Sequence, residues 1–148
     1  MTPGSIYNLE QVDYSERGSR IEIIVDGVPK PQTVIFSSTD YFGETYYFTE
    51  EGLRYINDSR LARSRQKFVL HYLDKIPKTM KNPMQFGRNL KEPDNFIYFQ
   101  KYAIKEHRHG NELLAVVLKK SNINVVWNFY WVEDGEVPSH IEILQRFK

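Results

Sequence analysis

The chain has 148 residues, enough to bury a core, and is expected to form a single domain over residues 1–148. It has no cysteine, which excludes disulfides, thiol nucleophiles and thiolate metal sites. The formal net charge is only +1, yet residues 60–91 carry nine Lys and Arg against a single Asp, whereas residues 1–59 are acidic. A basic segment in a nearly neutral protein indicates a local site for a polyanion.

The N-terminus lacks the basic and then apolar run of a signal peptide, and no stretch reaches the roughly 20 apolar residues of a membrane helix. We therefore expect a cytoplasmic protein with no membrane partner. Motifs typical of nucleotide-binding loops, serine hydrolases and zinc proteases are also missing from the sequence, which argues against those classes.

The N-terminal third is predicted to be rich in β-structure. Residues 1–19 are polar and show no periodicity, which predicts a flexible arm. Residues 20–48 form a β-rich N-terminal segment of three short predicted strands. Pro29 and Pro31 are expected to interrupt regular structure after the first strand. Residues 49–148 would then supply the helices and the sheet of the core.

Two helices are predicted next. Thr49 is a suitable cap for a short helix that begins with Glu50 and Glu51. A longer helix is predicted over residues 60–76, because its apolar side chains fall within one helical stripe. Residues 84–95 are predicted to be a loop.

The last part of the chain predicts four strands, at about residues 96–105, 112–119, 123–133 and 139–147. Their connections are too short for parallel crossovers, which predicts an antiparallel arrangement. The expected fold class is therefore α+β: an N-terminal β-rich segment, two helices, and a four-stranded antiparallel β-meander packed on the longer helix.

Alternation along the third of these strands places Trp127, Phe129 and Trp131 on one face, with Asn128 and Tyr130 on the other. A face that combines tyrosines, an asparagine and lysines is able to hold RNA, because aromatic rings stack on bases and lysines neutralise phosphates. A solvated outer face of a sheet commonly carries the same residue types, so this alternative stays open.

On the longer predicted helix, Lys67, His71 and Lys75 share one side. Two flanking lysines disfavour the protonated imidazole and would leave His71 neutral and able to act as a base. The alternative is a helix-edge histidine half packed against the core. The candidates for nucleic-acid binding are Arg60, Arg63, Lys67, Lys75, Arg88, Tyr98 and Lys101.

Residues 107–109, His-Arg-His, are a weak metal signal, because no pair of carboxylates lies nearby in the sequence. An exposed hairpin loop is the favoured interpretation, and neither a metal nor another cofactor is expected. His140, at the start of the last predicted strand, faces either the open side of the sheet or solvent.

Residues 68–147 resemble the barnase–EndoU–colicin–RelE-like (BECR) nuclease group, in particular its phage-associated branch. The resembling segments are the histidine-bearing helix Phe68-Val-Leu-His-Tyr-Leu-Asp-Lys-Ile, Thr79-Met-Lys-Asn-Pro83, Pro93-Asp-Asn-Phe-Ile-Tyr-Phe, Glu112-Leu-Leu-Ala-Val-Val-Leu-Lys and Val125-Val-Trp-Asn-Phe-Tyr. The resemblance implies a metal-independent ribonuclease fold of toxin type with its site on the exposed sheet face. His71 matches the group's helix histidine. Asn128 and Tyr130 fall where the group often has a hydroxyl residue followed by an aromatic; Asn128 departs from this pattern, since an amide cannot serve as a general acid.

Cleavage of RNA through its own 2′-hydroxyl needs a base, an acid and cations around the phosphorane. The catalytic candidates are His71, Tyr130, Asn128 and His140. The leading hypothesis is RNA binding or metal-independent endoribonuclease activity, with RNA and a cognate inhibitor protein as partners. The alternatives are a non-enzymatic cystatin-like binding module, for a small apolar ligand or a protein, and a purely structural role in a phage or mobile element.

Overall fold

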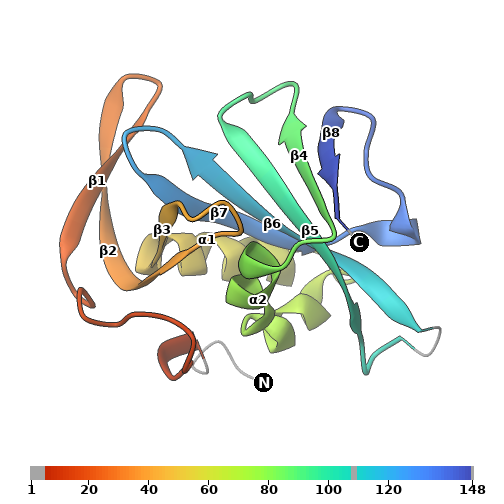
Figure 1. Cartoon of the computed structure of the whole chain (residues 1–148). Coiled ribbons are helices and arrows are strands. Elements are labelled where there is room, and N and C mark those ends of the chain that lie inside the picture. Colours follow the sequence, from red (N-terminus) through yellow and green to blue (C-terminus); the bar gives the residue numbers. More distant parts are fainter. Residues whose placement is uncertain (1–5, 108–109, 148) are drawn as a thin grey trace.

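The computed structural model describes residues 6–107 and 110–147, and its largest element is one eight-stranded β-sheet (Figure 1). The strands are β1 (Arg20–Val25), β2 (Val28–Thr39), β3 (Thr45–Thr49), β4 (Gln85–Asn89), β5 (Asn95–Ala103), β6 (Asn111–Lys120), β7 (Asn124–Trp131) and β8 (Ile141–Arg146). The helices are α1 (Glu50–Leu61), the 3-10 helix η2 (Lys67–Tyr72), α2 (Lys75–Lys81) and the 3-10 helix η3 (Glu133–Gly135). The α+β class is thereby confirmed.

The strand order is β1-β2-β3-β7-β6-β5-β4-β8, with β3 parallel to β7 and the other neighbours antiparallel. The predicted four-stranded meander is wrong in its last step. β5, β6 and β7 are consecutive neighbours, but β8 crosses the sheet and pairs with β4 instead of β7. The sheet is also larger than predicted, because β1 to β3 join it through the parallel pair Tyr47–Val125.

Strand β4 lies where a loop was predicted for residues 84–95. Its Gly87 and its polar residues give no strand signal, but the glycine has a structural reason. A Cβ at Gly87 would lie 2.8 Å from the carbonyl oxygen of Glu142 and 3.0 Å from Cγ2 of Ile141, both on β8. The β4–β8 pair therefore approaches too closely for a side chain at this position.

Gly87→Ala is expected to lower the free energy of unfolding by about 1–3 kcal/mol, because the neighbouring β8 backbone must shift to admit a methyl group. Urea unfolding of the variant beside the wild type measures this difference. A loss below about 0.5 kcal/mol, within the range of ordinary surface substitutions, would contradict the close packing of β4 on β8.

The predicted helix over residues 60–76 is wrong. α1 ends at Leu61, residues 62–66 form turns, and η2 and α2 follow as separate short segments. Pro77 does not end a helix but lies in the first turn of α2, where a missing N–H is tolerated. The helix that begins after Thr49 is instead longer than expected, and the predicted Thr49 cap is confirmed, since its Oγ1 accepts from the Gly52 N–H at 3.0 Å.

Pro29 and Pro31 do not interrupt β2, because β3 begins to pair with β2 only at Val34. The prolines lie opposite β1 at alternate positions, so their nitrogens face the unpaired edge and no ladder hydrogen bond is lost. Asp26 and Gly27, both with positive φ (52° and 76°), form the tight turn between β1 and β2.

The described part of the predicted flexible arm, residues 6–19, packs on the core. Ile6 is fully buried, and the Tyr14 hydroxyl donates to the Ile6 carbonyl and accepts from the Leu9 N–H. A bridge between Asp13 and Ser37 joins this segment to β2. The expectation of a free arm is therefore corrected for these residues.

The two faces of the sheet bury two separate apolar clusters. The helices cover one face and enclose the larger cluster, which includes Phe36, Phe48, Tyr98 and Phe129. The smaller cluster lies on the opposite face and is built around Ile97, Phe99, Val117 and Ile141. This second face is only partly filled, and it holds the pocket described next.

Candidate functional site

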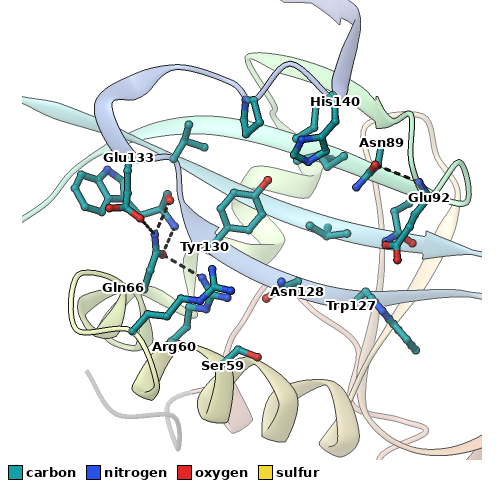
Figure 2. A pocket seen from close by; sticks show the side chains of 18 of the residues that line it. Ser59, Arg60, Gln66, Asn89, Glu92, Trp127, Asn128, Tyr130, Glu133 and His140 are labelled. Carbon is teal, nitrogen blue, oxygen red and sulfur yellow. Dashed lines mark hydrogen bonds between the residues drawn. The ribbon is translucent and has the colours of Figure 1, made fainter.

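A pocket of about 740 Å³ lies on the sheet face that carries the smaller cluster (Figure 2). Its walls come from the end of α1, the 62–66 turn, β7, the connection between β4 and β5, and the segment between β7 and β8. The segment from Val132 to His140, which leads β8 across the sheet, forms one wall. The unexpected position of β8 therefore helps to create the pocket.

A β-bulge in β7 determines which side chains reach the pocket. The register shifts between the pairs Val117–Asn128 and Leu118–Val126, so that Trp127 is the additional residue. Trp127 consequently joins Asn128 and Tyr130 along the pocket. The strict alternation predicted for this strand is corrected here: Trp127 does not share a face with Phe129, which packs under the helices.

Arg60 is the most unusual residue of the pocket. It is only 4% exposed, and its Nη1 donates to Oε1 of Gln66 at 3.2 Å. Its Nε has no hydrogen-bond partner, and it forms no ion pair with any carboxylate of the described residues. Burial, followed by the nearby Arg63, lowers the pKa of Arg60. The guanidinium, which stays protonated in proteins, is thus a buried cation with no direct ion pair, although the more distant Glu133 favours its charged form.

Gln66 holds this part of the pocket together. Its Oε1 accepts from the Trp131 N–H at 2.9 Å, and its Nε2 donates to the Trp131 carbonyl at 2.9 Å and to Glu133 Oε2 at 3.1 Å. β3 is short and pairs with β7 at Val125, so the edge of β7 is free at Trp131. The Gln66 amide takes the place of a neighbouring strand there and also orients Arg60 (Figure 2).

Asn95 supplies a second unpartnered atom to the pocket wall. The residue is 4% exposed, and its Nδ2 donates to Oε2 of Glu92 at 2.8 Å. This bond fixes the amide orientation, because a flipped amide would point its oxygen at a carboxylate. Oδ1 is left buried with no partner. Two residues of the pocket wall thus each have a buried side-chain atom that the described residues leave unpaired, Arg60 Nε and Asn95 Oδ1.

Tyr130 and His140 line the same pocket. Burial raises the pKa of Tyr130 to about 12, although the nearby Arg60 acts in the opposite direction. Its hydroxyl therefore stays protonated at neutral pH and serves as a hydrogen-bond donor. Figure 2 shows the Tyr130 hydroxyl pointing toward His140, whose carbonyl accepts from the Leu90 N–H at 2.7 Å. Asn128 Oδ1 accepts from the following backbone N–H, so Nδ2 is available to a ligand.

The structure brings five of the predicted site residues to this pocket: Arg60, Arg63, Asn128, Tyr130 and His140. The pocket wall is not purely basic, because three glutamates also contribute to it: Glu92, Glu133 and Glu136. The site consequently suits a ligand that carries both anionic and hydrogen-bond donor groups, rather than a uniform polyanion.

His71 lies outside this pocket, on η2, with its side chain 55% exposed and its Nδ1 3.3 Å from Glu106 Oε2. The predicted row of Lys67, His71 and Lys75 on one helix does not form, because η2 ends before α2 begins. Lys67 is exposed, and Lys75 lies 3.8 Å from Asp74. His71 therefore does not lie between two lysines on one helix, as predicted, but next to the carboxylate of Glu106.

Three further predicted binding residues also lie elsewhere. Tyr98 is fully buried under the helices and donates to Asp40 Oδ2 at 2.6 Å, so it is not available for stacking. Arg88 donates from Nε to the Pro93 carbonyl, with its guanidinium 5.6 Å from the centre of the Phe96 ring. Lys101 lines a different groove at the other end of β4. The basic segment of the sequence is thus distributed over several surfaces.

Sequence reasoning missed Gln66, Glu92, Asn95 and Trp127 as site residues. Asn95 carried a usable signal, since it shares its strand face with Ile97 and Phe99, and a polar side chain at a core position calls for a partner. Gln66 showed no such signal in the sequence, because its hydrogen-bond partner Trp131 is 65 positions away.

Within residues 6–107 and 110–147, no group of three or more His, Asp or Glu side chains is placed to hold a metal ion. Arg108 and His109 of the predicted His-Arg-His loop lie outside the described residues. None of the described helices has the length and apolar character needed to cross a membrane.

Comparison of the chain with models of protein families, with curated proteins and with solved structures found no match. The relationship to the BECR nucleases therefore stays a prediction from the sequence.

Proposed function

We propose that the protein binds single-stranded RNA, with one nucleotide held in the pocket of Figure 2. The observation that carries the proposal is Arg60, a buried guanidinium with an unpartnered Nε and no carboxylate partner. A buried charge with no direct ion pair is destabilising. An arginine in such a position is therefore better explained by a ligand than by the stability of the fold.

A phosphate group complements Arg60, because a guanidinium donates strong, charge-assisted hydrogen bonds to phosphate oxygens. The exposed Arg63 lies in the same wall and adds a second cation. Arg60 also stacks near Tyr130, with its guanidinium carbon 6.0 Å from the ring centre. The phosphate would thus be bound next to an aromatic side chain.

The rest of the pocket suits a nucleobase. Trp127 and Tyr130 present rings on which an unpaired base can stack. The Nδ2 of Asn128 can donate to an acceptor on the edge of a base, since the Asn128 Oδ1 is occupied by the Phe129 N–H. Stacking on these rings requires an unpaired base, and the sequence resemblance favours RNA over DNA. Charged and amide side chains in the pocket wall do not favour the alternative of a small apolar ligand.

The same site could also cleave the RNA that it binds. The 2′-hydroxyl would lose its proton and attack the adjacent phosphorus, and the bond to the 5′-oxygen would break as that oxygen gains a proton. The products would be a 2′,3′-cyclic phosphate and a 5′-hydroxyl. His140 replaces His71 as the candidate for proton transfer, because it lines the pocket together with Arg60 and the protonated Tyr130.

The test measures binding and cleavage of a mixed-sequence single-stranded RNA in EDTA, with an RNA duplex beside it. The wild type is expected to bind the single strand more tightly. If it also cleaves, His140→Ala should lose cleavage while His71→Ala, an exposed histidine outside the pocket, should retain it. Cleavage that depends on His71 would contradict this site, and failure of wild-type protein to bind RNA would overturn the proposal.

A further inference from the structure

A second groove, here called the Tyr41 groove, lies at the other end of β4 from the pocket of Figure 2. Its walls include Met84, next to the first residue of β4, whereas Asn89, the last residue of β4, lines the pocket. Its charged side chains are Lys101 and Arg146, and no Asp or Glu among the described residues lines it. Neither cation forms an ion pair with an acidic side chain in the described part of the chain. The groove is therefore electropositive, unlike the mixed pocket.

An exposed aromatic residue forms one wall of the groove. Tyr41 is 49% exposed, and its ring centre lies 4.5 Å from that of Phe147. The neighbouring Phe42 is 43% exposed and packs with its inner edge on Phe86. Large aromatic side chains at the surface beside unpaired cations are the combination that binds single-stranded nucleic acid, by stacking on bases and by neutralising phosphates.

The turn that carries Tyr41 is held by buried hydrogen bonds. Asp40 is 1% exposed, and its Oδ1 accepts from the backbone N–H groups of Phe42 and Glu44, both at 2.9 Å. Its Oδ2 accepts from the Tyr98 hydroxyl, and the Tyr41 N–H donates to the Met80 carbonyl at 2.8 Å. The backbone that carries the exposed ring is therefore fixed before a ligand arrives, which reduces the entropy lost on binding.

We infer that the Tyr41 groove is a second RNA subsite, in which a base stacks on Tyr41 while Lys101 and Arg146 bind the phosphates. The inference rests on the proposed function of the pocket and specifies its ligand as an oligonucleotide. Met84 and Asn89, one residue from each site, lie five positions apart along the chain, about 16 Å at about 3.3 Å per residue. A dinucleotide therefore fills the pocket alone, whereas a longer strand reaches both sites.

The test compares the affinities of a labelled dinucleotide and a labelled single-stranded dodecamer of the same base composition, by fluorescence anisotropy. Tyr41→Ala and the double variant K101Q/R146Q are measured beside Lys30→Gln, which removes an exposed cation remote from both sites. Wild-type protein should bind the dodecamer more tightly. Tyr41→Ala should weaken dodecamer binding by about tenfold and leave dinucleotide binding unchanged. K101Q/R146Q should reduce the slope of log K against log salt by about 1.4 for the dodecamer only.

Arg60→Met separates failure of this inference from failure of the proposed function. Suppose that Arg60→Met weakens dinucleotide binding while the groove variants leave dodecamer binding unchanged. The proposed RNA site in the pocket is then supported and the RNA subsite in the Tyr41 groove is overturned. The exposed aromatic residues would then be a contact for a protein partner. An equal loss in Lys30→Gln would also overturn the subsite, since it would show attraction by general charge alone. If the wild type binds neither RNA, the proposed function itself fails.

Discussion

Arg60→Met is expected to weaken binding of single-stranded RNA by about tenfold to a hundredfold while the free energy of unfolding stays equal or rises. Methionine keeps much of the apolar stem of the buried Arg60 but removes a buried charge that has no direct ion pair. A charge-assisted hydrogen bond contributes about 1.5–3 kcal/mol, which corresponds to this loss of affinity. Anisotropy titration and urea unfolding of the same preparation measure the two effects.

Arg54→Met is the matched control, because Arg54 lies on the same helix but is exposed and does not line the pocket. It should change neither quantity substantially. A large loss of stability in Arg60→Met with RNA affinity preserved would show that Arg60 serves the fold and not a ligand.

Gln66→Ala is expected to lower the free energy of unfolding by about 3 kcal/mol, the largest effect of any substitution considered. The change removes the hydrogen bonds of Gln66 to Arg60, Glu133 and both backbone groups of Trp131. An unsatisfied buried polar group costs about 1–3 kcal/mol, and two or more are created here. RNA affinity should fall as well, because Arg60 loses the group that orients it.

Gln145→Ala, on the exposed side of β8, is the control for Gln66→Ala and should change stability by less than about 0.5 kcal/mol. Gln66→Glu adds a second comparison, because it keeps the acceptor for Trp131 N–H but cannot donate to the Trp131 carbonyl. If Gln66→Ala lost less than about 1 kcal/mol, the Gln66 amide would not be replacing a strand at the edge of β7.

The strands were predictable where local pattern determines them. β5, β6 and β7 lie within a few residues of their predicted positions, since their apolar runs and turn residues are local signals. The partner of β8 was not predictable in this way. The predicted third and fourth strands were too long at their facing ends, which hid the connection from Trp131 to Ile141 that carries the chain across to β4.

The prediction of one helix over residues 60–76 was wrong, although several residues of its apolar stripe are buried as expected. Val69, Leu73 and Ile76 are all buried in the core under the sheet, as the stripe requires. Two short helical segments bury them as well as one long helix would, and a break before η2 lets Gln66 reach Trp131. That requirement is a tertiary contact, which helical periodicity does not report.

The candidate site was predicted in part. One pocket is lined by five of the predicted residues: Arg60, Arg63, Asn128, Tyr130 and His140. Local charge and the predicted strands were enough to select them from the sequence. The setting predicted for His71, between two lysines on one helix, depended on the long helix and is not found, because η2 ends at Tyr72. The bulge that turns Trp127 into the pocket depends on the register between strands, which a single sequence does not encode locally.

Ultraviolet crosslinking of a single-stranded RNA to the wild-type protein, followed by mass-spectrometric mapping of the modified peptide, tests the location of the RNA site most directly. Trp127 and Tyr130 should carry the crosslinks of a dinucleotide, because their rings line the pocket. A dodecamer should add crosslinks at Tyr41. Crosslinks confined to residues outside the pocket and the Tyr41 groove would contradict an RNA site at Arg60.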